Sequence, residues 1–223
     1  WNTVAVLEPF YGYSRKLVTQ FFSRRSHVSV APGLFEENAD VVVAALQESY
    51  EACPFEVLVA DHVSSQSGRV LPLTEVVEWC RKRGVVSVVD GTMQYDLLGI
   101  SVYPDYYLLS THKWLCNVKT CGVIRIEGAT LPLPEPVAAS CFYGSEDQFL
   151  WVGMQDYVPH IVLATALSLY EASNAEVLRG ASDVLKRGLS RIGCSPLLGG
   201  DRERLINMVE IPFRFDPGSL HDA

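Results

Sequence analysis

The 223-residue chain carries 18 basic against 26 acidic residues, a formal charge of −8, and 48% of its side chains are hydrophobic. This composition excludes an intrinsically disordered chain and can bury a substantial core, so one large domain with the start of another is expected. The longest aliphatic run, Val41 to Leu46, is far short of the roughly 18 residues that a membrane span needs. A soluble protein with no membrane partner is therefore predicted.

The charge balance and the cysteines indicate the protein's surroundings. The acidic excess repels phosphates, and the densest basic clusters, 24–25 and 81–83, are short and fall where exposed helix ends are expected, so no nucleic acid partner is predicted. The six cysteines form no C-x-x-C pair and no zinc-ligand spacing, so we expect a reducing, cytoplasmic compartment and no metal site. Because Trp1 is not a natural initiator, we expect a piece of a longer protein.

Strand and helix patterns alternate along the chain. In chain order, they predict a strand at Thr3–Leu7, a helix at Tyr13–Phe22, a strand at Val28–Val30, a helix at Glu37–Tyr50, a strand at Phe55–Ala60, a helix at Leu73–Arg83, strands at Val85–Val89, Tyr106–Leu109 and Gly122–Ile126, helices at Val158–Glu171 and Ala175–Leu189, and a strand at Leu205–Ile211. The apolar stripe from Val158 to Leu169 is interpreted as core. Strands that are apolar on both faces and alternate with helices predict an α/β domain around a mostly parallel sheet.

Ionisable residues follow three of the predicted strands. Asp61-His62 follows the strand that ends at Ala60, Asp90-Gly91 follows the strand that ends at Val89, and Ser110-Thr-His-Lys113 follows the strand that ends at Leu109. Active sites in parallel sheets lie at the carboxyl ends of the strands. These three strand ends are therefore the candidate site.

An acid and a lysine at neighbouring strand ends suit one cofactor in particular. The chain contains neither G-x-G-x-x-G after a strand nor G-x-x-x-x-G-K-[ST], which removes the main support for a dinucleotide or a P-loop site. Pyridoxal phosphate needs a lysine amine for its aldehyde and a carboxylate that keeps its ring nitrogen protonated. Asp90 and Lys113 could supply both, although an Asp-Gly after a buried strand is more often only a turn and a His-Lys pair is more often solvated.

The sequence motifs around these residues are more specific than their spacing. Asp61-His-Val-Ser-Ser-Gln-Ser-Gly68, Val88-Val-Asp-Gly91 and Ser110-Thr-His-Lys-Trp-Leu115 occur in this order. Together they resemble the fold-type I pyridoxal phosphate enzymes of the class V aminotransferase group, and above all the isopenicillin N epimerase-like branch. The resemblance implies a three-layer pyridoxal phosphate-binding large domain over residues 1–190 and the beginning of a small C-terminal domain over 191–223.

The resemblance also implies roles for individual residues. Lys113 would form the Schiff base, Asp90 would face the pyridine nitrogen, Ser65 would approach the phenolic oxygen of the ring, and Ser110 and His112 would bind the phosphate. The family is homodimeric, and the segment 151–156 resembles the stretch that reaches the neighbouring subunit's cofactor. The family's glycine-containing phosphate loop and ring-stacking residue are expected before Trp1, and its carboxylate-binding arginine after Ala223.

Three departures from the family pattern leave two functions open. Met93 stands where relatives have His or Gln beside the ring, Met154 replaces a threonine, and Cys116-Asn-Val-Lys-Thr-Cys121 replaces a Pro- or Gly-rich turn. One interpretation is an enzyme that epimerises, transaminates or cleaves a carbon–sulfur bond of an amino acid; the other is a non-catalytic binding or scaffold protein with the same fold. Retention of Asp90 and Lys113 favours the enzyme. For His62, contact with the cofactor and a purely structural role are equally supported.

Overall fold

The computed structural model describes most of the chain in several stretches. These are residues 1–21, 24–29, 38–94, 99–128, 131–132, 134, 154–170, 174–196 and 209–210. Residues 151–153 of the predicted subunit-crossing segment and 205–208 of the last predicted strand lie outside the described residues, as do most of 131–136.

Six strands form the main sheet. They are β1 (Thr3–Glu8), β2 (Arg24–Ser29), β3 (Val57–Asp61), β4 (Val86–Asp90), β5 (Tyr106–Ser110) and β6 (Gly122–Ile126). Their order is β2-β1-β3-β4-β5-β6, and every neighbouring pair is parallel except β5 and β6. The predicted α/β class with a mostly parallel sheet is confirmed. The carboxyl ends of β1, β3, β4 and β5 consequently meet along one edge of the sheet.

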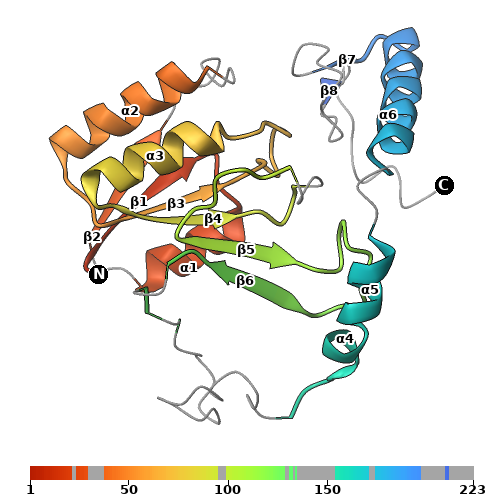
Figure 1. The fold of residues 1–223 in the computed structure, drawn as a ribbon. Helices are drawn as coiled ribbons and strands as arrows, with labels where there is room; N and C mark the ends of the chain where they lie inside the picture. The colour runs from red at the N-terminus through yellow and green to blue at the C-terminus, as the bar shows by residue number, and fades with distance from the viewer. Residues whose placement is uncertain are drawn as a thin grey trace.

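Six helices accompany the sheet within the described residues. They are α1 (Gly12–Phe21), α2 (Ala39–Ala52), α3 (Leu73–Arg83), α4 (Val158–Ile161), α5 (Leu163–Leu169) and α6 (Asn174–Arg191). The Asn38 side chain caps α2 by accepting a hydrogen bond from the Asp40 N–H, and Gly84 ends α3 with a φ of 66°, which glycine adopts without a Cβ penalty. Helices α2 and α3 lie over one face of the sheet and α1 lies on the other side (Figure 1).

The core lies between the sheet and helices α2 and α3. Small and branched side chains of β1 and β3 are fully buried there, among them Ala5 and Leu58. Leu46 of α2 and Val76 of α3 are 0% exposed and pack against them. Because the strands are buried, they hold the residues that follow their carboxyl ends in fixed positions.

Two predictions about elements were wrong. Strand β2 begins at Arg24, so Arg24 and Arg25 lie in a strand and not at a helix end. An edge strand tolerates this polar sequence because it pairs on one side alone, here with β1. The helix predicted at Val158–Glu171 is divided at Val162 and ends at Leu169.

The apolar stripe from Val158 to Leu169 is not core in the described part of the chain. Val158, Ile161, Leu167 and Leu169 are between 51% and 74% exposed. Helical spacing predicts that such residues share a face, but it does not supply the surface that buries them.

A second, two-stranded sheet pairs β7 (Ser195–Pro196) with β8 (Val209–Glu210). No helix among the described residues is both long and apolar enough to cross a membrane.

Candidate functional site

A cavity of about 360 Å³ lies at the carboxyl ends of the strands. All five residues predicted for the site line it: Ser65, Asp90, Ser110, His112 and Lys113. They come from three segments that are 20 or more residues apart in the sequence, and the parallel pairing of β3, β4 and β5 brings these together. The individual roles given to these residues stay predictions.

The Asp90 carboxylate is held by the turn that follows β4. Its Oδ1 accepts a hydrogen bond from the Thr92 N–H at 2.9 Å, and its carbonyl accepts one from the His62 N–H at 2.8 Å. The Thr92 hydroxyl in turn accepts a bond from the Ser110 N–H at 3.2 Å, which ties the ends of β4 and β5 together. The carboxylate is therefore a fixed acceptor and not a mobile surface group.

Lys113 lies in a loop that is built around buried Thr111. The Thr111 N–H and hydroxyl both donate to the Cys121 carbonyl, at 3.0 and 2.9 Å, and Asn117 donates through its side chain to the Thr111 hydroxyl at 3.0 Å. These bonds replace the Pro- or Gly-rich turn that the resemblance leads one to expect, and Cys116 takes up the positive φ of 52°. The loop thus presents Lys113 at the cavity without the family's turn residues.

Met93 contacts the lysine directly. The Lys113 ammonium donates to the Met93 thioether, with Nζ and Sδ 2.9 Å apart, and the Trp114 indole donates to the Met93 carbonyl at 2.9 Å. A thioether is a weak acceptor and cannot donate a hydrogen bond. In this position the amine is held loosely and is easily released to a better partner.

Ser65 lies at the tip of a tight loop between β3 and α3. The Ser64 hydroxyl accepts bonds from the Gln66 and Ser67 N–H groups, each at 3.3 Å, and Gly68 closes the loop with a φ of 72°. This geometry needs a glycine at position 68, because a side chain at that φ would be strained. The loop keeps Ser65 at the cavity.

His62 does not line the cavity and has a structural role. It is 5% exposed, and its Nδ1 lies 2.7 Å from the Tyr107 hydroxyl. Burial lowers the pKa of His62 to about 4, so the imidazole stays neutral at physiological pH. The Tyr107 ring in turn packs against Gly91, where a Cβ would overlap the ring.

Four polar residues of the cavity were missed as site candidates. Thr92 follows Asp90 by two residues; Asp61 stands at a strand end that the sequence indicated, although it was given no role; and Tyr11 and Ser14 follow the carboxyl end of β1. Applying the strand-end rule to the first strand as well would have pointed to Tyr11 and Ser14. The family's ring-stacking residue was expected before Trp1, yet the aromatic residue Tyr11 of this chain lines the cavity.

Polar atoms at the cavity lack partners within the described part of the protein. The His112 Nδ1 and the Asp61 Oδ1 are both buried with no hydrogen bond to any described residue. Buried polar atoms without partners are costly, and they occur where a ligand supplies the missing bond. The cavity therefore combines an amine, two carboxyl groups, hydroxyls and an imidazole around a space fit for a small polar ligand.

Comparisons with known proteins agree with this geometry. No protein-family model matches the chain. A probable chloroplastic L-cysteine desulfhydrase of Arabidopsis thaliana is 25% identical over an alignment of 224 positions, which covers 87% of this chain and 47% of the desulfhydrase. An isopenicillin N epimerase of Amycolatopsis lactamdurans is 45% identical over 85 residues, covering 35% of this chain and 21% of the epimerase.

A solved structure shows the same fold. The cystine C-S lyase C-DES, crystallised with glycine covalently linked to its pyridoxal phosphate cofactor, superposes with a TM-score of 0.69 and 20% identity over 91% of this chain and 59% of that one. The chain spans about half or less of the length of the curated relatives it matches. It is a homologue of the L-cysteine desulfhydrases and isopenicillin N epimerases, and it has the fold of the pyridoxal phosphate enzymes of the class V aminotransferase group.

Proposed function

We propose that the full-length protein is a pyridoxal phosphate-dependent enzyme that acts on an amino acid, by carbon–sulfur cleavage, epimerisation or transamination. The observation that carries this proposal is the cavity in which Lys113 and Asp90 lie together with the hydroxyls of Ser65 and Ser110 and the imidazole of His112. Each chemical feature of the cofactor, an aldehyde, a basic ring nitrogen and a phosphate, has a group of matching chemistry there.

The residues of the cavity fit this cofactor in number and in kind. Lys113 would hold the aldehyde carbon, Asp90 would hold the ring nitrogen, and Ser110 and His112 would bind the phosphate. The buried His112 Nδ1, which has no partner among the described residues, is suited to a strong acceptor or donor that a ligand brings. When bound, pyridoxal phosphate supplies an electron sink for the bond that breaks at the substrate α-carbon.

The protein's own residues would control charge and proton movement. Asp90, fixed by the Thr92 N–H, offers a stationary negative charge that needs no rearrangement as charge develops in the reaction. Lys113 would hold the cofactor, and its free amine would serve as the base for the proton of the substrate α-carbon. Its weak contact with the Met93 thioether leaves it free to exchange partners.

The first test is spectroscopic. Purified full-length protein incubated with pyridoxal phosphate should gain a visible absorption band, and borohydride should bleach this band and leave the pyridoxyl group on a lysine peptide. An amino acid substrate should shift the band, and a panel that includes cysteine, alanine and serine would narrow the reaction type. A protein that stays colourless at saturating cofactor would instead indicate the non-catalytic binding or scaffold protein.

We propose further that the full-length protein is a homodimer. Its support is the resemblance to a homodimeric family and the exposed apolar residues of α4 and α5, including Ile161 and Leu169. Obligate interfaces typically bury about 2,000 Å² or more. Sedimentation at micromolar concentration is expected to give twice the mass of one chain, and a monomer with cofactor bound would contradict the dimer.

The remaining proposals concern domain division and compartment. We place a cofactor-binding large domain at 1–190 and the beginning of a small domain at 191–223, supported by the separate pairing of β7 with β8. A cytoplasmic location is supported by the cysteines of the described residues, all of which are free thiols: Cys53, Cys80, Cys116, Cys121 and Cys194.

A further inference from the structure

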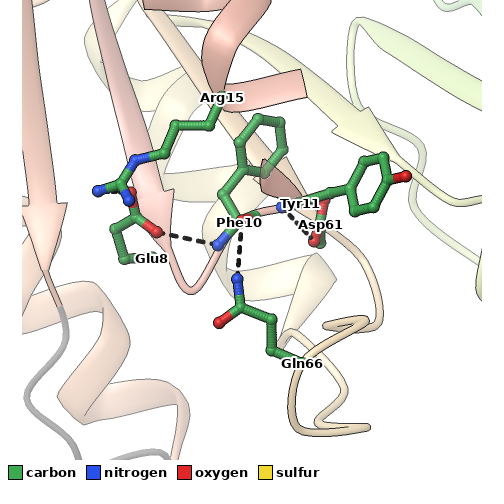
Figure 2. Close-up of polar contacts among 6 residues, drawn as sticks. All are labelled: Glu8, Phe10, Tyr11, Arg15, Asp61 and Gln66. Carbon is green, nitrogen blue, oxygen red and sulfur yellow. Dashed lines mark hydrogen bonds and ion pairs between the residues drawn. The ribbon is translucent and has the colours of Figure 1, made fainter. Parts of the chain in front are cut away.

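The turn between β1 and α1 is held by three side chains (Figure 2). Glu8 accepts a hydrogen bond from the Phe10 N–H at 3.0 Å, the Gln66 amide donates to the Phe10 carbonyl at 3.1 Å, and Asp61 Oδ2 accepts from the Tyr11 N–H at 3.0 Å. Asp61 is thus the contact that joins the end of β3 to the start of α1. Through it, Tyr11 is positioned at the cavity.

Asp61 also faces a second carboxyl group. It pairs with Asp90 in the register of parallel strands β3 and β4, and both residues line the cavity. The Asp61 Oδ2 is occupied by Tyr11, whereas its Oδ1 is buried and has no hydrogen-bond partner among the described residues. Two neighbouring carboxyl groups in a partly buried site do not both ionise readily, since like charges repel.

The other charged groups around Asp61 are unequal in effect. Glu8, at the end of β1, adds negative charge, but it pairs with Arg15 of α1 at 2.6 Å. Arg69 lines a smaller cavity together with Asp61, and Lys113 lines the main one with it. Burial first and the charge of Asp90 second raise the pKa of Asp61 to about 7, against smaller opposing effects of the Tyr11 N–H bond and of Lys113.

We propose that Asp61 is a positioning residue of the cofactor site, one that holds Tyr11 through Oδ2 and releases its proton to solvent when the cationic ring of the cofactor binds beside Asp90. This inference rests on the proposed function, because it takes pyridoxal phosphate as the ligand. The ring brings a positive charge next to two carboxyl groups, and that charge stabilises the ionised form of both. One carboxylate would balance the positive charge of the ring nitrogen. The second carboxylate would balance the positive charge of Lys113.

The proposal makes the affinity for the cofactor depend on pH in a defined direction. Below about pH 7, Asp61 of the free protein is protonated and must lose its proton on binding, so the dissociation constant should fall up to about tenfold per pH unit as the pH rises. Above about pH 7, the proton is already gone, and this contribution levels off.

The test uses pyridoxine 5′-phosphate, an alcohol that cannot condense with Lys113, and the full-length protein. Calorimetric titrations at about pH 6, in two buffers of different ionisation enthalpy, give the net number of protons released per ligand bound. The wild-type protein should release about one proton more than Asp61→Asn, which keeps an acceptor for the Tyr11 N–H. Glu8→Gln, from the same turn, is the matched control: it keeps an acceptor for the Phe10 N–H, and its proton release should stay close to that of the wild type because Glu8 affects Asp61 less than burial and Asp90 do.

Each outcome bears on a distinct claim. Equal proton release in the wild type and Asp61→Asn would overturn the role of Asp61 while leaving the cofactor site intact. A wild-type protein that binds neither the alcohol nor pyridoxal phosphate at any pH would overturn the proposed function and this inference with it. Should Asp61→Asn fail to fold, the wild-type pH profile alone decides, because a dissociation constant that is flat from about pH 5 to 7 contradicts proton release.

Discussion

Lys113→Ala is expected to abolish turnover and to leave the full-length protein unable to bind pyridoxal phosphate covalently. A positioned general base contributes about 10²- to 10⁴-fold, and the lysine would also hold the cofactor, so a loss of at least about a thousandfold in kcat is expected. Stability should change by no more than about 0.5 kcal/mol, because the side chain is exposed at the cavity and contributes little to the core.

The measurement combines kinetics with peptide mapping after borohydride treatment. The pyridoxyl label should sit on the peptide that contains Lys113 and disappear in Lys113→Ala. Lys119→Ala is the matched control, because Lys119 is an exposed lysine on the same loop, outside the cavity. A pyridoxyl label that persists in Lys113→Ala, or one that is found on Lys119 or Lys186, would contradict the assignment.

Asp90→Ala is expected to weaken cofactor binding and to reduce turnover further. A hydrogen bond to a charged group contributes about 1.5 to 3 kcal/mol, so the dissociation constant of the cofactor should rise roughly ten- to a hundredfold. Turnover should fall by more than binding does, because the proposed role of the carboxylate is to keep the ring nitrogen protonated while the substrate α-proton leaves. Covalent attachment at Lys113 should survive, since Asp90 is proposed to face the ring nitrogen and not the aldehyde.

Asp90→Asn separates the charge of this residue from its place in the turn. The amide oxygen can still accept the Thr92 N–H bond, so the fold of the strand end should persist, but the negative charge is gone. Cofactor titration and exchange of the substrate α-proton in deuterated buffer measure the two effects. If Asp90→Asn exchanged the α-proton as fast as the wild type, Asp90 would be only a turn residue.

The sequence predicted the parts of the fold that depend on local pattern. Strand β6 and helix α3 were predicted with their observed bounds, and the basic last turn of α3 followed by Gly84 is typical of a helix end. Strand β2 was placed too late, since its polar residues satisfy no strand pattern and their pairing with β1 is a long-range contact. Burial of the α4 and α5 stripe likewise depends on a partner surface that periodicity does not reveal.

The candidate site was predictable where motif and strand end coincide. Asp90 and Lys113 were recognised as site candidates because each follows an apolar strand and lies in a sequence motif typical of the family. The strand-end rule could have pointed to Tyr11, but the contacts that position it are long-range: Asp61 accepts from the Tyr11 N–H and Gln66 donates to the Phe10 carbonyl, each from 50 or more positions away. The contact between Lys113 and the Met93 thioether was hidden for the same reason, although Met93 was recognised as a departure.

The packing of Gly91 against the Tyr107 ring predicts that substitutions at these positions are correlated among homologues. A larger residue at 91 would require a smaller one at 107, because the two cannot share the space. Losing the Tyr107 hydroxyl would leave the buried His62 imidazole without its 2.7 Å partner, so His62 should change as well. In an alignment of close homologues, these three positions are expected to covary, while the exposed Tyr13 varies independently.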